Sequence, residues 1–131
     1  MSDSEVPATK APTAVICDDD SMSRQIARAV FEKAGYRILA GVGTALEALD
    51  MVLDHQPDVL LLDLVMPGMS GEEILPAIRS GSPNTQVVIY SSYDPTYAVK
   101  SGALFVVSKG QHGKLEATVE RLATTPNTVA G

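Results

Sequence analysis

Short apolar runs alternate along the chain with longer segments whose apolar residues recur every three or four positions. The runs, which are typical of strands, cover Thr13–Cys17, Tyr36–Val42, Asp58–Asp63, Gln86–Tyr90 and Ala103–Val107. The third run is almost entirely aliphatic, which indicates burial on both faces, as in a central parallel strand. Strands separated by helices predict a parallel sheet covered on both faces. We therefore expect an open, doubly wound, five-stranded α/β domain.

The first helical segment has clear start and stop signals. Asp20 or Ser21 is a suitable N-cap, and Gly35 stands where a glycine commonly ends a helix. The apolar positions that recur at helical spacing are Met22, Ile26 and Val30.

The second helical segment begins with Thr44 and Glu47, whose spacing matches a capping box. It runs to about residue 55, and we expect three leucines to point inward: Leu46, Leu49 and Leu53. Ser70 and Glu73 form a second capping box, which starts a third helix that continues through Arg79. Pro76 lies inside this helix and predicts a kink.

The remaining segments complete the domain. A short helical stretch is expected at about Pro95–Ser101, and a last helix at about Gly113–Ala123. Residues 1–12 and 124–131 are small, polar and proline-bearing, which is typical of flexible tails. We expect one domain over residues 13–123, because the whole chain has only 131 residues.

Composition narrows the classes of function. A net charge of −6 argues against a nucleic-acid surface, since phosphate backbones select basic patches. No apolar run reaches the roughly 18 residues that a membrane span needs, and the N-terminus lacks the features of a secretory signal. A cytoplasmic protein is therefore expected. The single cysteine, Cys17, excludes an internal disulfide and is expected to be a buried strand residue.

Chemically active residues follow the predicted strands. Asp18 and Asp19 follow the first strand, Asp63 ends the third, Ser91 follows the fourth and Lys109 follows the fifth. Since ligands of open α/β sheets bind outside the carboxyl ends of the strands, we expect these groups to converge. Asp20 is better explained as a helix cap, but capping does not account for an acid that ends a buried aliphatic strand.

This set of groups suits phosphoryl transfer. Clustered carboxylates repel one another, and a hard cation such as Mg²⁺ compensates them. The lysine suits a phosphate oxygen, the hydroxyl can donate a hydrogen bond, and a carboxylate can act as nucleophile to form an aspartyl phosphate. Phosphoryl transfer consists mostly of positioning and charge neutralisation, so neither histidine nor a reactive cysteine is required.

The segments VICDDDSMSR, DVLLLDLVMPGMSG, VVIYSS and GALFVVSK resemble the receiver domains of bacterial response regulators, of the chemotaxis-receiver type. The resemblance spans about residues 13–123, and its most specific part is Asp-x-x-Met-Pro-Gly-x-x-Gly after an apolar strand. It implies the flavodoxin-like strand order 2-1-3-4-5.

The resemblance also implies residue roles. Asp63 would be the phosphoacceptor and also a ligand of Mg²⁺. Asp19 would bind Mg²⁺ directly, Asp18 would bind it through water, and the main-chain carbonyl of Val65 would be a further ligand. The donor would be a sensor histidine kinase or a histidine phosphotransfer protein, and the protein would catalyse only its own phosphorylation and dephosphorylation.

The implied output is a switch. Ser91 would move toward the phosphoryl group, and Lys109 would pair with Asp63 or its phosphate. Pro67 and Gly68 would shape the neighbouring loop. The switch would change binding to a downstream protein target, with no direct contact to nucleic acid or membrane.

The sequence departs from the family at three places. Val106 stands where an aromatic switch residue is usual, and Gly110 follows the lysine where proline is common. The segment between Ser91 and Gly102 is about one helical turn short, so the fourth helix should be short or irregular. These departures affect the usual output face and leave the acidic site intact.

Two alternatives remain at this point. Asp18 and Asp20 also match the Asp-x-Asp spacing of haloacid-dehalogenase-type phosphatases, although the further acids of that family are missing after Lys109. The second alternative is a receiver-fold interaction module that is never phosphorylated. Few residues follow the last helix, so we expect a stand-alone receiver or a segment of a longer protein.

Overall fold

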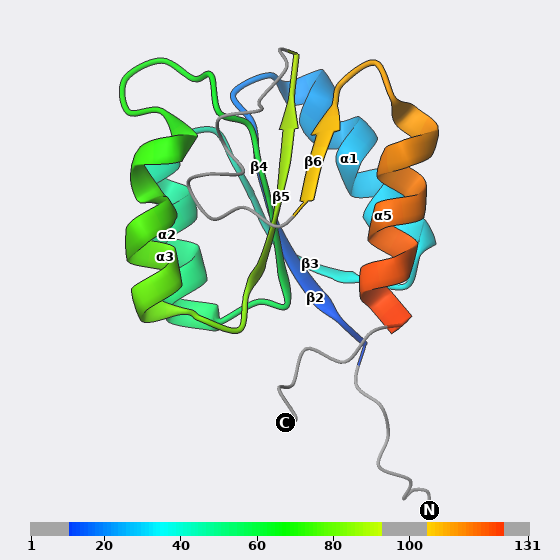
Figure 1. Cartoon of the computed structure of the whole chain (residues 1–131), viewed down its shortest axis with the longest axis horizontal. Coiled ribbons are helices and arrows are strands. Elements are labelled where there is room, and N and C mark those ends of the chain that lie inside the picture. The colour runs from blue at the N-terminus through cyan, green and yellow to red at the C-terminus, as the bar shows by residue number, and fades with distance from the viewer. Residues whose placement is uncertain (1–10, 93–104, 125–131) are drawn as a thin grey trace, which may run out of the picture.

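A computed structural model describes residues 11–92 and 105–124. Its core is one parallel sheet in the order β3-β2-β4-β5-β6 (Figure 1). The strands are β2 (Thr13–Cys17), β3 (Arg37–Val42), β4 (Val59–Leu62), β5 (Gln86–Ser91) and β6 (Phe105–Ser108). In chain order this is 2-1-3-4-5, so the predicted doubly wound topology is confirmed.

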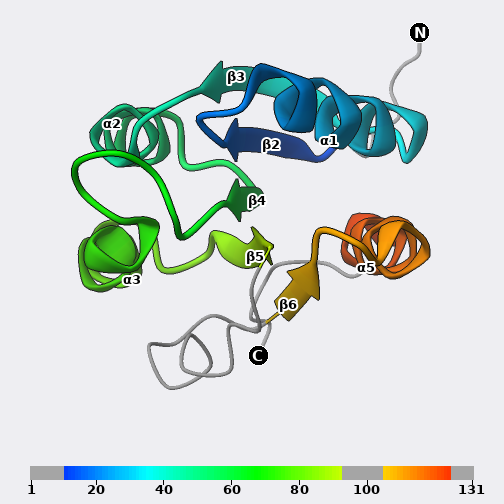
Figure 2. The same ribbon diagram turned by 90° about the horizontal axis from the view of Figure 1, so that it is seen from above.

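Helices cover both faces of the sheet. They are α1 (Ser21–Lys33), α2 (Ala45–His55), the 3₁₀ turn η1 (Gly71–Ile74), α3 (Leu75–Gly81) and α5 (His112–Thr124). Figure 2 shows α1 and α5 on one face and α2 and α3 on the other. This arrangement leaves the carboxyl ends of all the strands along one edge, where the described loops after β2, β3, β4 and β6 lead into helices.

The core is divided by the sheet into two layers. All four residues of β4 are buried, which confirms its predicted central place. Leu60 and Leu62 pack on the α2–α3 side, whereas Val59 and Leu61 pack on the α1–α5 side. On the α1–α5 side, the Tyr36 hydroxyl also donates a hydrogen bond of 3.0 Å to the carbonyl of Val119. Residues of β2 and β4 are thereby packed on both faces of the sheet.

The predicted helix caps are present. The Asp20 side chain accepts a hydrogen bond from the Ser23 amide (2.9 Å), and Thr44 Oγ1 accepts one from the Glu47 amide (3.2 Å). The second capping box is also formed, with Glu73 accepting from the backbone N–H of its N-cap residue at 3.0 Å. Gly35 has a positive φ of 95° directly after α1, which explains why a glycine stands there.

The apolar residues that recur at helical spacing in α1 are not the face that the helix buries. Met22 and Ile26 are 65% and 41% exposed, and only Val30 among them is buried. The residues that α1 buries are Ala27, Val30 and Phe31. The small Ala27 lets the helix lie close to the sheet, and the large Phe31 fills the space beside it.

The prediction that three leucines of α2 point inward is largely wrong. Leu46 and Leu53 are 56% and 40% exposed, and Leu49 is only partly buried against the core. The buried residues of α2 are Ala45, Ala48 and Val52. The leucines therefore lie at the side of the helix and not on the face that contacts the sheet. Side-chain size, as well as apolarity, decides which face of a helix fits against a sheet.

The kink predicted at Pro76 is also wrong. The expected third helix is divided into η1 and α3, and Pro76 lies in the first turn of α3. At that position the missing N–H of proline would have no helical partner in any case, and its fixed φ suits a helix start. Pro76 thus lies in the first turn of a new helix and not inside a continuous one.

Some predictions fall outside the described residues. These are the helical stretch Pro95–Ser101, the first two residues of the last predicted strand, and almost all of both predicted tails. Among the described residues, no helix is both long enough and apolar enough to cross a membrane.

Candidate functional site

The strand ends bring the predicted groups to one edge of the sheet. Asp18 directly follows β2, Asp63 follows β4, Ser91 ends β5 and Lys109 follows β6. Parallel pairing aligns the ends of neighbouring strands, since Cys17 is in register with Leu62 and Ser91 with Ser108. The pairing of β5 with β6 extends to Lys109, whose amide donates a hydrogen bond of 2.8 Å to the Ser91 carbonyl.

Three carboxylates form the centre of this edge. One oxygen from each of Asp18, Asp19 and Asp63 lies within 4.8 Å of the others. Asp18 is completely buried and Asp63 is 4% exposed, whereas Asp19 is exposed to solvent. Three acids at this spacing offer the hard oxygen donors that Mg²⁺ prefers, with one side open to water.

Lys109 is the cation closest to this cluster among the described residues. Its Nζ lies 2.7 Å from Asp18 Oδ2 and 3.4 Å from Asp63 Oδ2. The family resemblance implied pairing with Asp63, and the shorter contact is instead with Asp18. Burial alone would lower the pKa of Lys109, but its contacts with Asp18 and Asp63 raise it, so the amine stays charged.

Backbone amides hold the other oxygens of the two buried acids. The Asp20 amide donates to Asp18 Oδ1 at 2.9 Å, and the Val65 amide donates to Asp63 Oδ1 at 3.2 Å. The pKa of Asp63 is raised, chiefly by burial and also by the charge of Asp18, although the Val65 amide and Lys109 act in the opposite direction. The carboxyl of Asp63 is thus oriented by its own loop and surrounded by charge.

Ser91 is almost fully buried, and its Oγ has no hydrogen-bond partner in the part of the chain that the structure describes. Buried hydroxyls usually have a hydrogen-bond partner, so an unpaired hydroxyl at a strand end indicates a position where another group could bind.

Cys17 is buried, as predicted. The pKa of its thiol is raised to about 12, chiefly by burial and also by the charge of Asp18.

The loop after β4 is shaped by glycines. Gly68 has a φ of 82°, which disfavours other residues. Gly71 packs against the main chain of Asp63, so that a Cβ at this position would collide with the Asp63 carbonyl oxygen. The family motif contains both glycines, but sequence reasoning gave a role only to Gly68. Val65, whose amide donates to Asp63, is 47% exposed.

Comparison with known proteins identifies the family of this fold. The family model described as "Response regulator receiver domain" matches residues 14–120. The chain belongs to this receiver domain family. A solved receiver domain of the putative response regulator NarL from Mycobacterium tuberculosis is 27% identical, with a TM-score of 0.77 over 90% of this chain and all of that one.

Curated relatives of the receiver domain differ in their length. The chain is 33% identical to the protein-glutamate methylesterase/protein-glutamine glutaminase 3 of Hahella chejuensis, over 85% of this chain and 34% of that protein. It is 38% identical to sporulation initiation phosphotransferase F of Bacillus subtilis, over 60% of this chain and 63% of that protein. The chain therefore spans about a third of the length of the methylesterase.

The acids of this receiver domain fit a divalent cation. Receiver domains generally bind Mg²⁺ at an acidic pocket, and here Asp18, Asp19 and Asp63 form such a cluster. Two of these acids are buried with a single lysine between them, which leaves excess negative charge at the strand ends. The donor set contains oxygens only, as hard cations require.

Proposed function

We propose that this receiver domain is a signalling switch that accepts a phosphoryl group on Asp63 from a histidine kinase or a histidine phosphotransfer protein. The observation that carries the proposal is the position of the Asp63 carboxylate. One of its oxygens is held by the Val65 amide, while the other faces Lys109 within the three-acid cluster. A fixed and partly neutralised carboxylate at an open sheet edge is well placed as a nucleophile. A cytoplasmic location fits such donors.

The transfer exchanges one bond to phosphorus for another. An oxygen of the Asp63 carboxylate attacks the phosphorus, and a P–O bond forms. The bond between phosphorus and the donor's imidazole nitrogen breaks, and its electron pair remains on that nitrogen. The reset is hydrolysis, in which water attacks phosphorus, the aspartyl P–O bond breaks, and carboxylate and inorganic phosphate are released.

Asp18, Asp19, Asp63 and the main-chain carbonyl of Val65 would hold Mg²⁺, with Asp18 acting through water. When bound, the ion supplies positive charge that offsets the charge on the phosphoryl oxygens. Lys109 is already positioned at Asp63 by its contact with Asp18, and it can follow a phosphoryl oxygen with a small movement of its flexible side chain.

The response would begin at Ser91. A phosphoryl group carries nearly two negative charges and strong acceptor oxygens. The unpaired Ser91 hydroxyl can donate to such an oxygen, which would draw the end of β5 toward Asp63. Val106 in β6 is only partly buried and lacks the ring of an aromatic switch, so we expect the altered surface to recognise a downstream protein without that ring.

The test is intact-mass spectrometry after treatment with acetyl phosphate. A single phosphate adduct is expected with Mg²⁺, and none is expected in EDTA or with Asp63→Asn. Asp54→Asn, an exposed acid on α2, is the matched control and should be labelled like the wild type. If neither acetyl phosphate nor a kinase labels the wild type while Mg²⁺ binds, the unphosphorylated interaction module is favoured.

The phosphatase alternative has little support in this geometry. Asp20, its second required acid, is used as the N-cap of α1 and accepts hydrogen bonds from both the amide and the hydroxyl of Ser23. Turnover of a small phosphate ester by the wild type would be required to restore that alternative.

A further inference from the structure

Arg24 extends from the first turn of α1 back toward the loop that carries two of the acids. Its Nη1 donates a hydrogen bond of 2.7 Å to the main-chain carbonyl of Asp18, six residues earlier. No carboxylate pairs with Arg24 among the described residues. The arginine therefore links a rigid helix to the backbone of the acidic cluster.

That carbonyl belongs to the peptide that joins Asp18 to Asp19. The Asp18 amide is already fixed by a 3.0 Å hydrogen bond to the Val42 carbonyl, and its carboxylate by the Asp20 amide and Lys109. The carboxylate of Asp19 is exposed and has no hydrogen bond or ion pair within the described residues. The orientation of Asp19 thus depends on its backbone, and Arg24 holds the peptide that precedes it.

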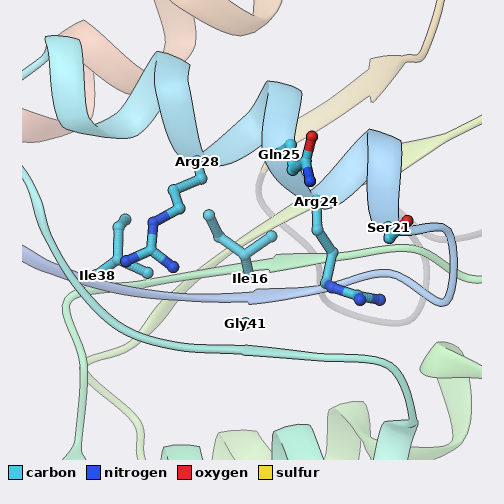
Figure 3. A pocket seen from close by; sticks show the side chains of 7 residues that line it. All are labelled: Ile16, Ser21, Arg24, Gln25, Arg28, Ile38 and Gly41. Atoms are coloured by element: carbon cyan, nitrogen blue, oxygen red, sulfur yellow. The ribbon is translucent and has the colours of Figure 1, made fainter.

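The α1–β3 side of the sheet leaves room for this side chain. Figure 3 shows Arg24 and Arg28 leaving the same face of α1 toward the strands and turning in opposite directions, beside a pocket that includes Gly41. Gly41 and Gly43 present no side chain there; a Cβ on Gly43 would lie 3.5 Å from Arg24 Nη1 and 3.9 Å from Asp19 Cα. The guanidinium can therefore pass over β3 and reach the loop.

We infer that Arg24 is a positioning residue, which orients the Asp18–Asp19 peptide and thereby sets Asp19 for cation binding. This inference rests on the proposed Mg²⁺ site. Groups that orient metal ligands typically change metal affinity 10- to 100-fold when they are removed. A loss of about 10-fold is expected here, because Asp18 retains its other hydrogen bonds.

If Arg24 acted only through its charge, its removal would have the opposite effect on Mg²⁺ affinity. Arg24 is a cation near the proposed site, so its removal by electrostatics only would strengthen Mg²⁺ binding. Arg24→Met removes both the charge and the hydrogen bond, whereas Arg24→Lys keeps the charge and can still donate to a carbonyl. Arg28→Met is the matched control, since Arg28 lies one turn further along the helix, lines the same pocket and pairs with Glu32 at 3.2 Å.

The first measurement is Mg²⁺ titration by calorimetry, on variants shown by circular dichroism to be folded. We expect Arg24→Met to bind about 10-fold more weakly, Arg24→Lys to bind with intermediate affinity, and Arg28→Met to match the wild type within about twofold. If Arg24→Met is unfolded, Arg24→Lys supplies the same comparison. Equal or tighter binding by the folded Arg24 variants would overturn the inference.

A second measurement without metal separates this inference from the proposed function. Amide resonances and hydrogen exchange of residues 18–20 are recorded by NMR in EDTA. We expect faster exchange and shifted resonances at these residues in Arg24→Met but not in Arg28→Met. If the wild type fails to bind Mg²⁺, the proposed function fails, while unchanged amides in Arg24→Met would overturn the positioning role itself.

Discussion

The site has two halves that differ in how their polar groups are satisfied. In the β2–β4 half, Asp18 and Asp63 each accept a hydrogen bond from the backbone two residues later. In the β5–β6 half, the Ser91 hydroxyl has no partner among the described residues, and Lys109 reaches across to the other half. In the β2–β4 half the carboxylates are therefore held in place by backbone hydrogen bonds. In the β5–β6 half a hydroxyl is still able to donate one. This combination suits the switch proposed above.

The largest change in stability is expected from removing Lys109, whose side chain links the two halves of the site. Lys109→Met leaves two buried carboxylates facing each other, and breaking a buried ion pair typically costs about 3–5 kcal/mol. Because the Lys109 side chain is 21% exposed, water screens part of this effect. We expect the free energy of unfolding in EDTA to fall by about 2–3 kcal/mol, measured by urea denaturation.

Mg²⁺ should restore part of that loss, since an ion that binds only the folded state stabilises it. Lys114→Met, on the exposed start of α5, is the control and should change stability by less than about 0.5 kcal/mol. An unchanged unfolding free energy for Lys109→Met in EDTA would show that the halves are not coupled through this lysine.

An intermediate loss of stability is expected from adding a side chain in the β2–β4 half, where Gly71 packs against Asp63. In Gly71→Ala, the new methyl group would collide with the Asp63 carbonyl oxygen and lie 2.9 Å from Leu62 Cγ. We expect stability to fall by about 1–3 kcal/mol, as for other overpacked sites, and labelling by acetyl phosphate to slow. Gly113→Ala, where a Cβ would meet nothing within 4 Å, should be neutral or stabilising. Wild-type behaviour of Gly71→Ala would mean that this half is less rigid than we infer.

The smallest change, a gain in stability, is expected in the β5–β6 half. Ser91→Ala removes a buried hydroxyl that has no partner among the residues that the structure describes, and such groups cost about 1–3 kcal/mol. We expect the unphosphorylated protein to become more stable by about 1 kcal/mol, with Mg²⁺ affinity unchanged within twofold. The exposed neighbour Ser92 serves as the control in Ser92→Ala. A destabilised Ser91→Ala would show that the hydroxyl is already bonded.

The two kinds of element were not equally predictable from the sequence. The strands were readable because continuous aliphatic runs such as Leu60–Leu62 have only one favourable place, inside the sheet. The helices were harder, because leucine and methionine can lie at the edge of a helix–sheet contact. Ala27 and Ala48 carry little signal in an apolar pattern, yet they are fully buried where the helices approach the sheet.

The site shows the same division. The strand-end groups were predictable because parallel topology brings carboxyl ends together. The closer pairing of Lys109 with Asp18 was not predictable, because it depends on side-chain direction at the ends of two different strands. Arg24 was missed since its partner is a main-chain carbonyl, which leaves no complementary residue in the sequence.

The central claim is that Asp63 itself accepts the phosphoryl group, and borohydride trapping tests it most directly. Borohydride reduces an aspartyl phosphate to homoserine, which peptide mass mapping then locates. After treatment with acetyl phosphate and Mg²⁺, the account predicts homoserine at position 63, and none there when Mg²⁺ is omitted. Homoserine at another aspartate, or no trapped product from protein that carries a phosphate adduct, would contradict the claim.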